Sequence, residues 1–212
     1  IPEFIGMLYI AFGMGFLGFI DDFLGDSKNK GFKGHIYSFL KKKEVSTGLL
    51  KAAFGFVLAL TAAAFIKNGL LIIIIAALII ALTTNTINSL DLRPGRAIKF
   101  FFAISFFLLL FSDNPETPYL VAPFWAIILV YLPYELKEKV MLGDSGANIL
   151  GGGLGYISII SLGFKAQLIV VLALIVFQIL CEFYSLSKII DNNRFLKYLD
   201  ILGRKMGEEG ER

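Results

Sequence analysis

The sequence predicts an all-α protein, a polytopic bundle of transmembrane helices with about seven spans. Hydrophobic residues make up 57% of the 212 residues and charged residues only 17%, and the mean hydropathy is +0.75. Apolar runs near the length that crosses about 30 Å of hydrocarbon recur along the chain. Most basic residues also fall in segments that would share one side of a membrane. A water-soluble core is therefore the wrong picture.

Seven apolar runs are the candidate spans. They cover residues 4–20, 49–66, 70–84, 98–111, 119–134, 147–163 and 166–186. The fourth run is the shortest, so we expect it to tilt or to be flanked by snorkelling side chains. We expect one transmembrane domain over residues 1–190 and a cytoplasmic polar tail over residues 191–212.

The basic residues orient the chain. With seven crossings, all of the 20 Lys and Arg residues except Lys67 and Lys165 fall on one side. By the positive-inside rule that side is cytoplasmic, which predicts a multi-pass protein of the cell membrane. The net charge is only +3. Lipid headgroups or an anionic substrate are therefore the expected partners, and nucleic acid is not.

Two single residues limit other interpretations. Cys181 is the only cysteine, so the chain can build neither a disulfide framework nor a cysteine-based metal site, and redox chemistry is not expected. The sequence opens on Ile1 within an apolar stretch. We therefore expect the natural N-terminus to be absent.

The first candidate site is the pair Asp21 and Asp22, which closes the first span on the cytoplasmic side. The end of a helix is electrostatically unfavourable for carboxylates, because the helix dipole is negative there. Two adjacent carboxylates can hold a divalent cation, or repel each other until one becomes a base. The alternative is that both are solvated acids at a membrane boundary.

The second candidate site follows the third span. Asn85, Asn88 and Asp91 are spaced three residues apart, so they fall near one face if the helix continues. Hard oxygen ligands of this kind suit Mg²⁺ and phosphate. Arg93 and Arg96 then offer two guanidinium groups for phosphate. The alternative is that the asparagines form hydrogen bonds between helices.

The third candidate site is Asp144, within the segment Gly-Asp-Ser-Gly, on the same side of the membrane. Capping of a helix could explain this aspartate without any ligand. Gly151 and Gly155 follow at the spacing that allows close helix packing. Neither alternative explains why all three carboxylate-bearing segments emerge on one side.

The cytoplasmic loop between the first two spans adds weaker candidates. Lys30, Lys33 and His35 follow the aspartate pair closely. We interpret His35, the only histidine, as a solvated or phosphate-contacting residue rather than a metal ligand. The loop lysines are candidates for the same phosphate or for lipid headgroups.

Taken together, these three segments resemble the polyprenyl-phosphate N-acetylhexosamine-1-phosphate transferase family. The shared features are Phe-Ile-Asp-Asp ending at Asp22, Asn-x-x-Asn-x-x-Asp ending at Asp91, and Gly-Asp-x-Gly around Asp144 with a glycine cluster after it. Their order, spacing and sidedness match, and the resemblance covers most of the chain. Members have about ten helices, so this chain resembles a part of the family's bundle, without the first two spans and the last.

The resemblance implies transfer of a sugar 1-phosphate from a UDP-sugar to a membrane polyprenyl phosphate, with Mg²⁺ as cofactor and Mn²⁺ as an alternative. By similarity, Asn88 and Asp144 would bind the metal. Asp21 and Asp22 would position or deprotonate the lipid phosphate. A homodimer is the assembly that we consider for the protein.

The chain departs from the family pattern at three places. Pro94 stands where the family often has an acid or amide that contacts uracil, and Gly25 stands where a lysine is common. The tail has no His-x-His cluster. These departures motivate a second hypothesis, a non-catalytic homologue that binds lipid phosphate or scaffolds a glycan-assembly complex. A transporter is disfavoured, because the runs carry essentially no charge near their midpoints.

Overall fold

A computed structural model describes residues 2–24 and 47–204, and the structural statements below concern those residues. Within them the chain forms helices and no strand. The long helices are α1 (Pro2–Leu24), α3 (Thr47–Ile66), α4 (Leu70–Leu90), α5 (Arg96–Phe111), α6 (Thr117–Leu136), α7 (Gly143–Ser161) and α8 (Phe164–Phe183). Two short helices follow, α9 (Leu186–Asn192) and α10 (Arg194–Ile201). The predicted all-α membrane helix bundle is confirmed.

Each predicted span corresponds to one long helix, and the differences lie at the polar ends. Helix α1 continues past residue 20, so Asp21 and Asp22 belong to its last turns. Helix α4 continues past residue 84 to Leu90, because Asn85 and Asn88 are accommodated on the helix as the spacing predicted. In the described part of the chain, α1, α4, α6 and α8 are long and apolar enough to cross a membrane. The full number of crossings stays a prediction.

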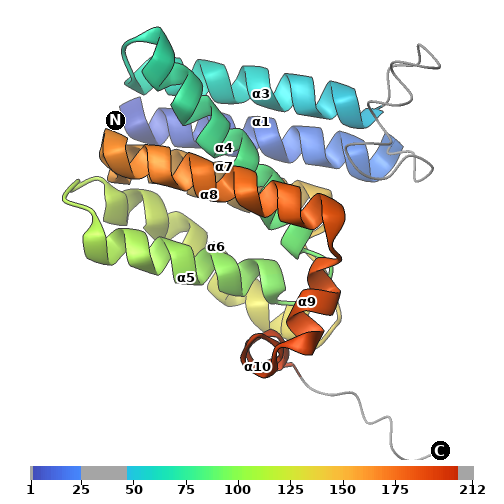
Figure 1. Ribbon diagram of the computed structural model, residues 1–212. Helices are drawn as coiled ribbons and strands as arrows, with labels where there is room; N and C mark the ends of the chain where they lie inside the picture. The colour runs from blue at the N-terminus through green and yellow to red at the C-terminus, as the bar shows by residue number, and fades with distance from the viewer. Residues whose placement is uncertain (1, 25–46, 205–212) are drawn as a thin grey trace, which may run out of the picture.

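Helix α7 is the centre of the bundle and packs against both α1 and α4 (Figure 1). Its glycines allow this. A Cβ at Gly151 would lie 2.5 Å from the Cα of Thr84, and one at Gly155 would lie 2.6 Å from the Cα of Ile80. The two backbones therefore touch, as small residues permit in membrane bundles. In contrast, α8 turns large apolar side chains outward, which suits a helix that faces lipid.

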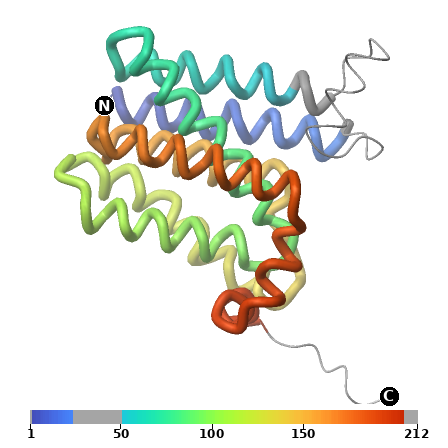
Figure 2. The backbone as a smooth tube through the Cα atoms, in the orientation of Figure 1, coloured from blue at the N-terminus to red at the C-terminus, as the bar shows by residue number. Residues whose placement is uncertain are grey.

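The polar ends of the helices gather at one end of the bundle, which we call the site end. The last turns of α1 and α4 and the first turns of α3 and α7 meet there (Figures 1 and 2). The chain returns to the same end through α9 and α10. Segments that are far apart in sequence thus bring their polar residues together.

Candidate functional site

Two carboxylates converge on one ammonium group at the site end. The Nζ of Lys51 donates to Oδ2 of Asp21 at 2.7 Å and to Oδ2 of Asp144 at 2.9 Å. The lysine comes from the first turns of α3, and the aspartates come from α1 and α7. The side chain of Asp144 is 34% exposed, so solvent reaches the pair. We call Asp21, Asp22, Lys51 and Asp144 the acid–lysine centre.

Asp22 holds the first turn of α7 from the neighbouring helix. Its Oδ1 accepts the backbone N–H of Asp144 at 3.0 Å. Its Oδ2 accepts the backbone N–H of Ser145 at 3.1 Å and the Ser145 hydroxyl at 2.7 Å. The carboxylate therefore lies at the positive end of the α7 dipole, which offsets its unfavourable place at the end of α1. Asp144 does not cap its own helix by a side-chain hydrogen bond, so the capping alternative is wrong for it and applies to Asp22.

Close backbone contact makes the Asp22 bonds possible. Gly18 lies one turn before Asp22 on α1, and a Cβ there would meet the Cα of Ser145 at 2.6 Å. Any side chain at this position would push α1 away from the first turn of α7. The Gly-Phe-Ile-Asp-Asp order thus couples a small contact residue to the carboxylates that follow it.

Asp91 borders the acid–lysine centre from α4. It accepts a backbone hydrogen bond from Gly143, the residue before Asp144. Its Oδ1 is buried and has no hydrogen-bond partner among the described residues. Burial, and next the charge of Glu135, raise the pKa of Asp91 to about 7. The carboxyl group is therefore able to exchange a proton near neutral pH.

Asn88 lies one turn before Asp91 on the stripe of α4 that packs against α7. The helices α4 and α7 are antiparallel, and their close contacts recur every four residues. Ile80 meets Gly155, and Thr84 meets Gly151. The next step places Asn88 beside the first turns of α7, just after Asp144. No hydrogen bond to the Asn88 side chain occurs within residues 2–24 and 47–204.

Asn85, in contrast, points to α8. Its Nδ2 donates to Oε1 of Gln178 at 2.6 Å, and Nε2 of Gln178 donates to Oγ1 of Thr86 at 2.9 Å. This is the hydrogen bonding between helices that was the alternative for the asparagines. The structure therefore does not bring Asn85 to the acid–lysine centre, although it does bring Asp91 there.

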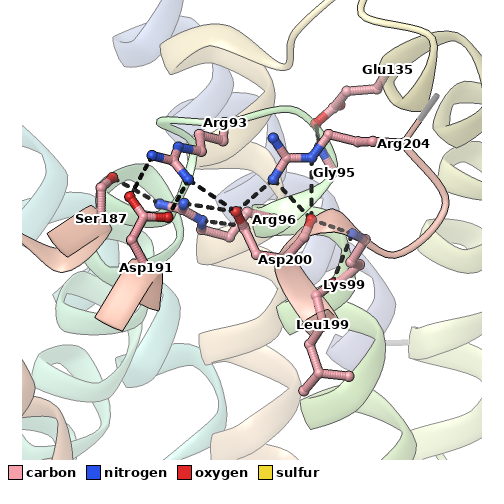
Figure 3. A network of polar contacts seen from close by, with 10 residues as sticks. All are labelled: Arg93, Gly95, Arg96, Lys99, Glu135, Ser187, Asp191, Leu199, Asp200 and Arg204. Atoms are coloured by element: carbon pink, nitrogen blue, oxygen red, sulfur yellow. Dashed lines mark hydrogen bonds and ion pairs between the residues drawn. The ribbon is translucent and has the colours of Figure 1, made fainter. Parts of the chain in front are cut away.

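Arg93 and Arg96 pair with the tail of the chain (Figure 3). The two terminal nitrogens of Arg93 bind the two oxygens of Asp191, each at 2.8 Å. The Nε of Arg96 binds Oδ1 of Asp200 at 2.7 Å, and Arg204 binds Oδ2 of Asp200 at 2.6 Å. We call these five residues the arginine cluster. Both arginines predicted to bind phosphate are thus engaged by carboxylates of the protein.

Asp200 is the hub of the arginine cluster. Its side chain is 2% exposed and accepts bonds from three arginines. Burial alone would raise its pKa, but the hydrogen bond and charge of Arg96, with those of Arg204, lower the pKa of Asp200 to about 2. The Nζ of Lys99 adds bonds to the backbone oxygens of Leu199 and Asp200 at 3.0 and 2.8 Å. The tail is therefore fastened to the start of α5.

Glu135 fixes the turn that carries Pro94. It is fully buried near the end of α6, and its Oε1 accepts the backbone N–H of Gly95 at 2.6 Å. Gly95 has a φ of 78°, a left-handed conformation that favours glycine. The turn between Asp91 and Arg96 is thus held by α6 and by the tail.

The described residues hold no cluster of three or more His, Cys, Asp or Glu side chains arranged for a metal. The donors that are present still suit Mg²⁺, which is commonly held by one or two carboxylates together with substrate phosphates. Asp21 and Asp144 already enclose a positive charge, the Lys51 ammonium. Lys30, Lys33 and His35 lie outside the described residues.

Sequence reasoning missed Lys51, Glu135 and Asp200 as functional or organising residues. Lys51 carried a usable signal, since a lysine in the first turn of an apolar helix on the acidic side needs a nearby anion. The same argument applies to Glu135, an acid at the end of α6. Asp200 carried no such signal, because charged residues are ordinary in a polar tail.

These features define a class: a polytopic membrane protein with a site of carboxylates and a cation at one end of its helices. The profile of Glycosyl transferase family 4 matches residues 4–162, and the chain belongs to that family. Over 172 residues it is 28% identical to the phospho-N-acetylmuramoyl-pentapeptide-transferase of Clostridioides difficile (strain 630). The match covers 74% of this chain and 52% of that relative, so the chain spans about half of the relative's length. No solved structure matches it significantly.

Proposed function

We propose that the protein transfers a sugar 1-phosphate, an N-acetylhexosamine 1-phosphate by preference, from a UDP-sugar to a membrane polyprenyl phosphate for cell-wall or surface-glycan synthesis. Membership of the family and the name of the relative support the reaction class. The observation that carries the proposal is the convergence of Asp21 and Asp144 on Lys51. This centre lies where helices end, within reach of both a soluble nucleotide sugar and a lipid phosphate.

In the proposed reaction, an oxygen of the lipid phosphate bonds to the phosphorus that carries the sugar. The bond from that phosphorus to UMP breaks, and UMP leaves. Phosphoryl transfer needs mainly alignment of the reactants and neutralisation of their charge. A bound Mg²⁺, held by Asn88 and Asp144, would supply charge neutralisation at the diphosphate.

The residues of the centre have separable tasks in this proposal. Asp22 is held by the first turn of α7, so its task is to fix Asp144 in place. Asp21 and Lys51 lie together beside Asp144, where the ammonium can attract the lipid phosphate and the carboxylate can orient it. A phosphate monoester is already largely dianionic at neutral pH. Positioning of the acceptor is therefore a sufficient role for Asp21.

The test uses membranes that contain the full-length protein, a panel of nucleotide sugars, and polyprenyl phosphate. We expect a lipid-linked sugar phosphate and UMP to form with Mg²⁺, less so with Mn²⁺, and not with a chelator. Asp144→Asn should abolish the product, whereas Asp113→Asn, in an exposed loop at the far end of the bundle, should not change it. Undiminished turnover in Asp144→Asn would overturn the mechanism.

One observation favours a second candidate, the non-catalytic homologue that binds lipid phosphate or scaffolds a glycan-assembly complex. Asn85, Arg93 and Arg96, all expected to contact substrate, are paired with groups of the protein itself. This candidate predicts binding of polyprenyl phosphate without a metal and no product with any nucleotide sugar. Turnover with one donor would eliminate it.

We also propose that the site end faces the cytoplasm, where nucleotide sugars are made. The proposal rests on the positive-inside rule applied to the sequence. Cysteine labelling from outside intact cells tests it. The cysteine of Asp113→Cys should react with an impermeant reagent, and the cysteine of Lys137→Cys should not. The reverse pattern would overturn the orientation.

A further inference from the structure

Helix α10 is amphipathic, but it turns a polar residue toward the protein and its apolar residues outward. Its polar residue Asp200 faces the protein and is buried by the arginine cluster. Apolar residues face outward, with exposed fractions of 68% for Phe195, 63% for Tyr198 and 40% for Leu199, and of 49% for Leu202, the residue directly after the helix. Their spacing of i, i+3, i+4 and i+7 places them on one stripe about 100° wide, opposite Asp200. We call these four residues the outer stripe.

The orientation of α10 gives the outer stripe a place relative to the membrane. The long helices run across Figure 1, whereas α10 is seen end-on and therefore lies crosswise to them. Lys99, in the first turn of α5, binds the backbone oxygens of Leu199 and Asp200, so α10 lies beside the start of that apolar helix. If the long helices cross the membrane, a helix with this placement would lie parallel to the membrane plane, at the level where the spans end.

Basic residues accompany the outer stripe. Lys188, Arg194 and Lys197 are exposed, and none of them lies within 4 Å of a carboxylate in the part of the chain that the structure describes. Arg194 borders the stripe, and Lys197 lies further round toward the polar side. Exposed aromatic and aliphatic side chains with basic neighbours are the pattern of a helix that lies on an anionic membrane surface.

We propose that α10 is a membrane-surface helix, whose outer stripe enters the boundary between headgroups and acyl chains while Arg194, at the border of the stripe, contacts anionic phospholipids. The exposed apolar surface of α8 ends in Phe183 and Tyr184, so lipid-facing surface leads along the chain into this segment. The arginine cluster then connects the membrane surface to the turn that carries Asp91. Asp200 therefore links the lipid-contacting helix to the residues that shape the site end.

Spin labelling of the full chain in vesicles tests the proposal. In a Cys181→Ser background, one label is placed at Tyr198→Cys in the outer stripe, and the matched control at Lys197→Cys on the polar side of the same helix. The vesicles contain phosphatidylcholine and phosphatidylglycerol. Collision rates are measured with oxygen, which concentrates in hydrocarbon, and with a water-soluble nickel chelate.

We expect the ratio of oxygen to nickel collisions to be several-fold higher at position 198 than at 197, and to fall at 198 when phosphatidylglycerol is replaced by phosphatidylcholine. Nickel access at 198 equal to that at 197 would show a water-facing stripe and overturn the proposal. Protection from both reagents would show a covering protein surface, from a second copy or another segment, and would overturn it too. A ratio that ignores phosphatidylglycerol would overturn the role of anionic lipid.

If Tyr198→Cys does not fold, Phe195→Cys on the same stripe gives the same readout. The measurement reports depth rather than turnover, so its failure and the failure of the proposed transferase reaction are distinguishable.

Discussion

The acid–lysine centre and the arginine cluster lie at the same end of the bundle, and both pair carboxylates with cations. They differ in how completely the charges are enclosed. In the arginine cluster, Asp200 is 2% exposed and Arg96 is 5% exposed. In the acid–lysine centre, Asp144 is 34% exposed, and one ammonium serves two carboxylates.

This difference separates a fastening from a site. The buried and paired charges of Asp200 and Arg96 cannot take a new partner without large cost, so they hold the tail against α5. The side chains of Asp21, Lys51 and Asp144 are 21% to 34% exposed, so this group of two acids and one lysine can exchange its partners for a phosphate or a metal ion. Loss of the first should therefore lower stability, and loss of the second should lower activity.

The largest expected effect tests the fastening. Asp200→Asn leaves three arginines without their shared carboxylate, and we expect the unfolding free energy to fall by about 3 kcal/mol or more. Thermal unfolding in detergent measures the change. The control is Asp191→Asn, whose carboxylate is exposed and, among the described residues, binds Arg93 alone; it should leave the melting temperature almost unchanged. Equal melting temperatures for both variants would contradict the hub role of Asp200.

The next effect is smaller in free energy and concerns activity rather than stability. It tests the acid–lysine centre. Lys51→Gln removes the charge between Asp21 and Asp144, and we expect transfer to slow by about 100-fold with little change in melting temperature. The control is Lys67→Gln, just beyond the other end of α3. If both variants transfer at the rate of the unchanged protein, Lys51 takes no part in the reaction.

Asp22 should contribute stability through α7. Asp22→Asn keeps one acceptor oxygen but loses the charge at the positive end of the helix, so we expect a cost of about 1 kcal/mol. Thermal unfolding checks it, with Asp113→Asn as the control. Stability equal to the control would mean that Asp22 does not hold the first turn of α7.

The last test is a dependence of stability on pH. Because burial raises the pKa of Asp91 from 3.8 to about 7, the folded state binds a proton that the unfolded state releases between these values. The contribution of Asp91 to stability is full below pH 3.8 and is lost as the pH rises through 7. Melting temperatures of the unchanged protein should therefore fall relative to Asp91→Asn over this range. Parallel pH profiles would show that Asp91 keeps an ordinary pKa.

Asp200 should show the opposite sign. Its pKa is lowered to about 2, so its contribution is present at neutral pH and is lost only as the pH falls from 3.8 toward 2. A rise in pH therefore lowers stability through Asp91, beside the acid–lysine centre, and raises stability through Asp200, in the arginine cluster.

Long apolar runs were enough to predict the seven long helices, because a spanning helix must satisfy its backbone internally and be apolar throughout. The meeting of Asp21 with Asp144 also followed from sidedness. The partner of each asparagine did not. Asn85 and Asn88 are alike in sequence, and only the packing of α8 decides that Asn85 binds Gln178.

The tail was the least predictable part. A hydrophobic run announces a span, but a short polar segment can be solvated or fastened, and Asp200 differs from any surface aspartate only through the arginines that reach it. The outer stripe of α10 does show in the sequence, as Phe195, Tyr198, Leu199 and Leu202. The polar composition around it led us to expect only a polar tail.

The contact between α4 and α7 at Gly151 and Gly155 sets how the site end can adapt. Where backbones touch, no layer of side chains remains that could compress or repack, so α4 and α7 behave as one rigid unit. We therefore expect Asn88, Asp91 and Asp144 to keep their spacing when ligands bind. Any widening needed to admit a lipid and a nucleotide must come from α3, which brings Lys51, because α1 also touches the backbone of α7 at Gly18.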